Sequence, residues 1–66
     1  MSVIKVLEIL TSSNKSWEDA TQNAVAEAAK TVREIRSVNV KNLSATVKDG
    51  KISEYRVNCK ITFEVK

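Results

Sequence analysis

The 66-residue chain contains no histidine and no proline, and it has only one cysteine and one glycine. Without histidine, a His-based triad and a histidine general base are excluded. A single cysteine excludes a disulfide within one chain, and the lack of histidine also excludes a tetrahedral zinc site built from one chain. The lone glycine rules out a glycine-rich phosphate loop. The eight acidic residues form no tight cluster and lack calcium-loop spacing, so the sequence argues against an enzyme.

The charge pattern and the lack of long apolar runs restrict the partners. The net charge of +3 is mild, and the basic residues are interleaved with acidic ones, which is typical of a solvated surface. No segment approaches the roughly 20 apolar residues that span a bilayer, and the N-terminus lacks the features of a signal peptide. We therefore predict a cytoplasmic protein without nucleic-acid or membrane partners, in which residues 1–66 form one domain.

The apolar periodicity predicts one helix that follows a first strand. A strand is expected from about Ser2 to Leu10, and the polar stretch Thr11–Lys15 has turn chemistry. Ser16 has the features of a helix N-cap, with acidic residues in the first turn behind it. Apolar residues at three- and four-residue steps predict a helix that continues to about Arg36, with basic residues near its end.

Two further strands follow, joined by a tight hairpin. The second strand is expected to begin near Ser37, and its apolar phase shifts in the way that a β-bulge near Asn42 produces. Asp49-Gly50 is a strong hairpin signal, because both turn residues need positive φ. The third strand alternates regularly from Tyr55 to Val65. We predict an α+β fold, β-α-β-β, with a three-stranded antiparallel sheet in the order 1-3-2 that wraps one long helix.

The first strand is apolar on both sides. Val3, Leu7 and Ile9 point to one side, and Ile4, Val6 and Leu10 point to the other. One helix can cover only one side of a sheet. A domain of this size buries only about 60% of its unfolded surface, so it is marginally stable alone. These features predict self-association, because a monomer rarely leaves such an apolar face exposed.

Four side chains have both a packing and a functional interpretation. Cys59 lies on the apolar side of the third strand and is interpreted as a buried small hydrophobe rather than a nucleophile. Trp17 is interpreted as an anchor at the helix start rather than a stacking platform. Arg56 and Lys60 share the polar side of the third strand and offer cations to an anionic ligand if copies of the chain enclose a space. The alternative is that Arg56 is an exposed residue paired with Glu54 or Glu64.

The order of motifs resembles the dodecins, a family of small bacterial and archaeal proteins. The resemblance covers essentially the whole chain and depends on order and spacing. The matching stretches are Thr11-Ser12, Ser16-Trp17, Thr31-Val32, Val38-x-Val40, Tyr55-Arg-Val57 and Phe63-Glu-Val65. It implies a hollow homododecamer that commonly binds flavins.

Two positions depart from the flavin-binding pattern that this resemblance implies. Flavin-binding dodecins stack the isoalloxazine ring on a tryptophan just after the helix, where this chain has Ser37. They hydrogen-bond the ring's polar edge with a glutamine directly after the tyrosine of the third strand, where this chain has Arg56. The sequence is closer to the branch described as calcium-binding dodecins, although no local carboxylate cluster specifies metal ligands.

Together with the lack of catalytic motifs, the resemblance implies a non-enzymatic, dodecin-like cage that binds, stores or buffers a small ligand or ion. Ser37 and Arg56 are the expected ligand-site positions, with either a flavin (FMN or riboflavin) or calcium as the ligand. The alternative is a flavin-binding dodecin that stores riboflavin or FMN despite the two substitutions.

Overall fold

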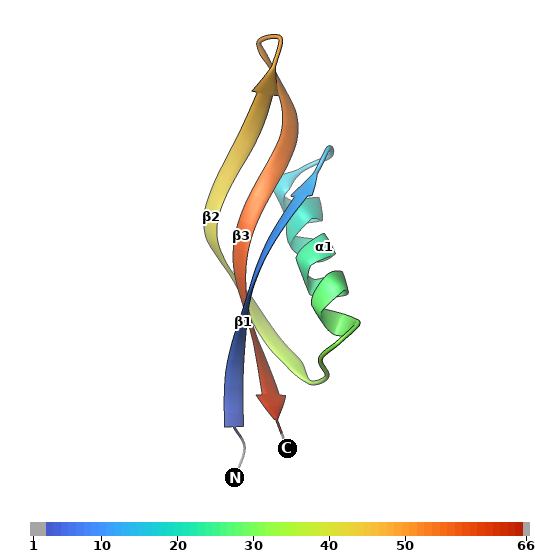
Figure 1. Cartoon of the computed structure of the whole chain (residues 1–66), viewed down its shortest axis with the longest axis vertical. Coiled ribbons are helices and arrows are strands. Elements are labelled where there is room, and N and C mark those ends of the chain that lie inside the picture. The colour runs from blue at the N-terminus through green and yellow to red at the C-terminus, as the bar shows by residue number, and fades with distance from the viewer. Residues whose placement is uncertain (1–2, 66) are drawn as a thin grey trace.

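The computed structural model describes residues 3–65, so the expected first strand residue, Ser2, lies outside the described range. Its elements are β1 (Val3–Ser13), α1 (Trp17–Ala29), β2 (Ile35–Lys48) and β3 (Lys51–Val65). The sheet has the order β1-β3-β2, and β3 is antiparallel to both neighbours. Figure 1 shows α1 lying along one side of this sheet. The predicted α+β class, β-α-β-β topology and strand order are confirmed.

The helix is shorter than predicted, and its expected end near Arg36 is wrong. α1 ends at Ala29, and the amide of Val32 still donates to the carbonyl of Ala28 at 2.9 Å. Glu34 then adopts a φ of 60°, which turns the chain into β2. Val32 and Ile35 lie at helical spacing, yet they pack against the core from the loop and from β2.

The basic residues expected at the helix end lie beyond it. The last turn of α1 contains no basic side chain. Lys30 is the C-cap, and Arg33 and Arg36 follow in the loop and in β2. Of these three residues only Lys30 stands at the helix end, and Arg33 and Arg36 lie beyond the range of the helix dipole, which falls off within the last turn.

The first strand is longer than predicted, because the polar stretch after Leu10 continues it. Thr11 and Ser13 belong to β1 and pair with β3. Their hydroxyls hold the helix: Thr11 Oγ1 donates to the carbonyl of Ala20 at 2.6 Å, and Ser13 Oγ donates to Asp19 Oδ2 at 2.6 Å. These bonds satisfy the polar groups and favour strand over turn at these positions.

Three local predictions are confirmed. Ser16 is the N-cap of α1, and its hydroxyl accepts from the amide of Asp19 at 2.9 Å. The register of β2 shifts between Val40 and Asn42, as a bulge there requires. Asp49 and Gly50 have φ values of 53° and 74°, the left-handed pair of a tight hairpin.

The core lies between the alanine side of α1 and the middle of β3. Small side chains let the helix approach the sheet closely. The buried apolar residues are Ala20, Ala24, Ala28, Val57, Cys59 and Ile61. Three of these six are alanines, so the core contains little large apolar volume.

Much apolar surface stays open. The hairpin of β2 and β3 extends past α1 and past the end of β1 (Figure 1), and the molecule measures 52 × 19 × 13 Å. The side of β1 that faces away from the helix exposes Ile4, Val6 and Leu10, as the two-sided pattern predicts. Among residues 3–65, the one helix falls short of the length and apolarity needed to cross a membrane.

Candidate functional site

The sheet has one side covered by α1 and one side without a helix, here called the open face. The open face carries the polar positions of β3 from Glu54 to Glu64, together with their neighbours on β1 and β2. Because directly paired residues share a face, the register defines rows across it. The rows run from β1 through β3 to β2 and comprise Val6, Thr62 and Ser37; Glu8, Lys60 and Asn39; Leu10, Asn58 and Asn42; and Ser12, Arg56 and Ser44.

Ser37 lies at the start of β2 on the open face. It pairs with Thr62, and the two hydroxyls are hydrogen-bonded to each other. Both side chains therefore already have a partner within the chain. Ligand binding at Ser37 requires that bond to be shared or replaced.

Arg56 lies on the same open face as Ser37, but nearer to the hairpin that joins β2 and β3. It lies between Ser12 on β1 and Ser44 on β2. Across residues 3–65, its guanidinium forms no ion pair and no side-chain hydrogen bond. Within the same range the alternative pairing is not formed: Glu64 binds Arg36, and Glu54 accepts from Ser12 Oγ at 3.4 Å.

The structure does not bring Ser37 and Arg56 together within one chain. Thr62, the partner of Ser37, stands six residues from Arg56 on β3, which corresponds to roughly 20 Å along a strand. A single ion does not bridge that distance. An ion site that uses both residues must therefore combine different copies of the chain.

A charged cluster that sequence reasoning missed lies where the loop after α1 meets the end of β3. Arg36 Nε donates to Glu64 Oε1 at 3.1 Å, and Arg36 Nη2 also contacts Glu64 and lies 3.3 Å from Glu34 Oε2. The amide of Glu64 donates to the carbonyl of Glu34 at 3.0 Å. The hydrogen bond and the charge of Glu64 raise the pKa of the Arg36 guanidinium. No sequence signal indicates this cluster, since the contact depends on the turn at Glu34.

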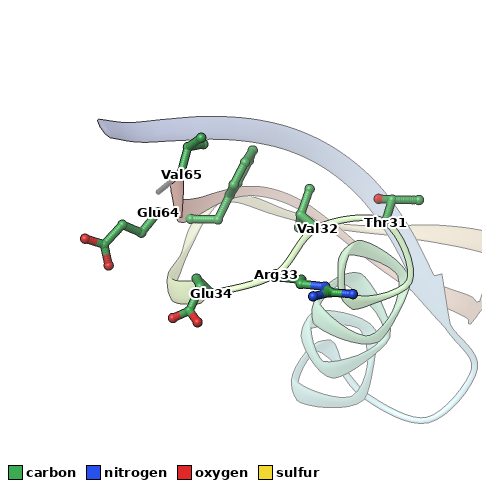
Figure 2. A pocket seen from close by; sticks show the side chains of 7 residues that line it. Thr31, Val32, Arg33, Glu34, Glu64 and Val65 are labelled. Atoms are coloured by element: carbon green, nitrogen blue, oxygen red, sulfur yellow. The ribbon is translucent and has the colours of Figure 1, made fainter. Parts of the chain in front are cut away.

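A hollow lies beside this cluster. Its volume is about 450 Å³, and it is lined by Thr31, Val32, Arg33, Glu34, Phe63, Glu64 and Val65. Figure 2 shows the side chains of Arg33 and Thr31 on the helix side and those of Glu34 and Glu64 toward the end of β3. Neither Ser37 nor Arg56 lines this hollow, so it is separate from the predicted ligand positions.

The two packing interpretations from the sequence are confirmed. Trp17 meets Tyr55 edge to face, with ring centroids 4.9 Å apart, and its Nε1 donates to the carbonyl of Ser44 at 2.8 Å. Cys59 is fully buried. Loss of hydration raises the pKa of the Cys59 thiol, and a hydrogen bond with Thr21 acts in the opposite direction. Cys59 is therefore part of the core, and Trp17 packs at the start of α1.

Metal ligands do not cluster within one described chain. Across residues 3–65, no three histidine, cysteine or acidic side chains gather closely enough to hold a metal ion. The carboxylates of Glu34 and Glu64 lie near each other but share Arg36 as a counter-ion.

Comparisons with known proteins agree on one family. The dodecin family's sequence profile matches residues 3–66. The calcium dodecin of Mycobacterium tuberculosis is 37% identical over 67 residues, which cover 100% of this chain and 93% of that protein. The dodecin of Thermus thermophilus is 32% identical over 63 residues, which cover 96% of this chain and 91% of that protein.

Solved structures show the same arrangement. An arginine-to-alanine mutant of the T. thermophilus dodecin matches with a TM-score of 0.94 at 30% identity, covering 100% of this chain and 98% of that chain. The M. tuberculosis calcium dodecin, described as calcium-chelating with a novel calcium-binding site, matches with a TM-score of 0.84 at 35% identity, covering 97% and 91%. Both similarities extend over nearly the full length of each chain.

Proposed function

Because the chain belongs to the dodecin family, we propose that it assembles into a homododecameric shell that binds, stores or buffers a small ligand or ion without catalysing a reaction. In this proposal, residues 1–66 form one domain and act in the cytoplasm. Ser37 and Arg56 line the ligand site, and neither nucleic acid nor membrane is a partner.

The observation that carries the proposal is the balance between buried and exposed apolar side chains. Apart from three alanines, residues 3–65 contain three almost completely buried apolar side chains, of which two are large, whereas ten large apolar side chains are substantially exposed. The buried ones are Val57, Cys59 and Ile61. The exposed ones are Val3, Ile4, Val6, Leu10, Trp17, Val40, Leu43, Val47, Ile52 and Val65. A monomer with this surface is only marginally stable. Association with identical copies covers the exposed apolar area without a second kind of chain.

The chemistry of the open face supports a ligand other than a stacked flavin ring. Ser37 offers no aromatic surface, and a stacking contact between an aromatic side chain and a ring is worth about 1–3 kcal/mol. The similarity to a calcium dodecin makes calcium the first ion to test. Because no three acidic or cysteine side chains gather within residues 3–65, we expect a calcium site to draw its carboxylates from more than one copy.

The test is solution mass combined with the absorbance spectrum of the purified protein. A dodecamer of the 7.3 kDa chain has a mass of about 88 kDa. We expect that mass, no visible flavin band, and a thermal midpoint that rises when calcium is added to the chelator-treated protein. A monodisperse 7.3 kDa particle at micromolar concentration contradicts the shell. A particle that is yellow as purified, or that quenches added riboflavin, supports the flavin-binding alternative.

A further inference from the structure

One row of the open face combines an unpaired guanidinium with two hydroxyls. The register places Ser12 of β1 and Ser44 of β2 directly beside Arg56 of β3. Directly opposite side chains on one face have Cβ atoms about 4.5–5.5 Å apart. The three side chains therefore lie side by side on the open face. We call these three residues the Arg56 row.

From this arrangement we propose that the Arg56 row is a subsite for a phosphate group, and that a phosphate-bearing anion is one ligand of the proposed shell. The inference rests on the proposed ligand-binding function and names the chemical class of the ligand. A guanidinium presents a planar fork of N–H donors that matches two phosphate oxygens, and a serine hydroxyl donates one further bond to such an oxygen.

The guanidinium of Arg56 is available for this role. Within residues 3–65 it forms no ion pair, whereas Arg36 contacts both Glu34 and Glu64. Glu64 is thereby engaged elsewhere. Within the described residues, the charge of Arg56 is therefore not neutralised by an ion pair with a carboxylate.

The two serine hydroxyls differ in whether they already donate a hydrogen bond within the chain. Ser44 Oγ makes no side-chain hydrogen bond within residues 3–65 and is free to donate. Ser12 Oγ donates to Glu54 Oε2 at 3.4 Å, which is long for a hydrogen bond between oxygens. Exchanging that bond for one to phosphate costs little, because the Glu54 side chain is exposed to water.

Neighbouring charges set the strength of the subsite. Glu54 stands two residues from Arg56 on the same face, and its charge opposes an anion. Lys60 stands four residues away on the same face and favours one. The balance predicts weak to moderate affinity that falls with salt, because exposed charges are screened over about 10 Å at 0.1 M ionic strength.

The experiment measures binding of inorganic phosphate to the assembled protein by calorimetry at low ionic strength. Arg56→Gln removes the cation and is the residue found in the family's flavin-binding pattern. Arg33→Gln is the matched control, since Arg33 is an exposed arginine in the loop after α1, away from the row. We expect Arg56→Gln to weaken phosphate binding by about tenfold or more, and Arg33→Gln to leave it unchanged.

Further variants keep the inference testable if Arg56→Gln disturbs assembly. Ser44→Ala retains the charge and should weaken phosphate binding by a smaller factor, about two- to fivefold. The mass of each variant is measured alongside. A particle of about 88 kDa that binds no phosphate, or that binds it equally with and without Arg56, overturns the subsite but leaves the shell in place. A protein that stays at 7.3 kDa overturns the proposed function itself.

Competition identifies the source of the phosphate. Displacement of bound phosphate by FMN but not by riboflavin assigns the row to a phosphate ester. Persistence of phosphate binding in the presence of both assigns it to free phosphate. Displacement by riboflavin at the same concentration as FMN overturns the assignment, because riboflavin carries no phosphate.

Discussion

At the residue scale, the chain separates side chains that pack in the core from side chains that lie on the open face. Cys59 and Arg56 illustrate the division, since they stand three positions apart on β3 and point to opposite sides of the sheet. Cys59 is fully buried against α1, whereas Arg56 is exposed and unpaired within residues 3–65. The alternation of a strand is sufficient to assign both sides, which is why both residues were assigned from the sequence.

Cys59 provides a pH-dependent prediction. Burial raises the pKa of its thiol in the folded protein, so the folded state keeps the proton at a pH where the unfolded chain loses it. The stability contributed by the neutral thiol is complete below the unfolded pKa of about 8.5 and declines as the pH rises above it. We expect the free energy of unfolding to fall more steeply between pH 8 and 10 in the wild type than in Cys59→Ala, as measured by urea titration.

Thiol labelling serves as the control for this prediction. The native thiol should react with Ellman's reagent much more slowly than the thiol of the urea-unfolded chain. Rapid, complete labelling of the folded protein at pH 8 would contradict both the burial and the direction of the pKa shift.

At the element scale, the ends of the helix differ in how well the sequence predicts them. The start of the helix is determined by neighbouring residues, because the hydroxyl of Ser16 accepts a hydrogen bond from the amide of Asp19, three residues later. The end of the helix is not determined locally. Val32 and Ile35 continue the helical spacing, but their side chains pack against the core from outside the helix. Tertiary packing and the left-handed turn at Glu34 override the periodicity there.

The same distinction applies to the other elements and to the candidate site. The bulge near Asn42 and the Asp49-Gly50 hairpin depend on adjacent residues and were predicted. The extension of β1 to Ser13 depends on hydroxyl bonds to α1, and the Arg36–Glu64 pair joins residues 28 positions apart, so neither was predicted. Arg56 was indicated by its place on the polar side of the third strand and by the family resemblance, whereas Ser37 rested on the resemblance alone. The distance between the two positions became visible only in the register.

Removal of the helix cap is the first prediction at this scale. Ser16→Ala deletes the acceptor for the amide of Asp19 and should lower the free energy of unfolding by about 1 kcal/mol. Ser16→Asp keeps an acceptor at the same position and is the matched control. Urea titration of the three proteins checks the order, and equal stability of Ser16→Ala and wild type would contradict the role of the cap.

The hairpin provides the second prediction. Gly50 has a φ of 74°, and a Cβ added there meets nothing within 4 Å, so a substitution is strained by the backbone alone. Gly50→Ala should therefore cost about 1–2 kcal/mol. Gly50→Asn should cost less, because asparagine tolerates the left-handed region. Equal losses in the two variants would point to a steric clash that the structure does not contain.

At the scale of the whole molecule, part of the uncovered apolar surface lies on the helix side of β2. α1 packs mainly over β1 and β3, so the helix side of β2 keeps exposed apolar residues along its length. They include Val40, Leu43 and Val47, of which Leu43 is 59% exposed and Val47 is 68% exposed. The polar residues between them face the other way. This stripe and the open side of β1 are the surfaces that assembly has to cover if the shell forms.

A single charge in the stripe therefore tests assembly directly. Leu43→Glu places a carboxylate on the surface that a neighbouring copy is expected to cover, and burying an unpaired charge costs several kcal/mol. The same substitution costs the isolated subunit little, because Leu43 is mostly exposed. We expect mass photometry to show loss of the dodecamer in Leu43→Glu, while the far-ultraviolet circular dichroism of the subunit is retained.

Gln22→Glu adds the same charge to an exposed position on α1 and should leave the mass unchanged. Assembly of Leu43→Glu at wild-type concentration would place the subunit interface on a different surface, such as the open side of β1 at Ile4, Val6 and Leu10.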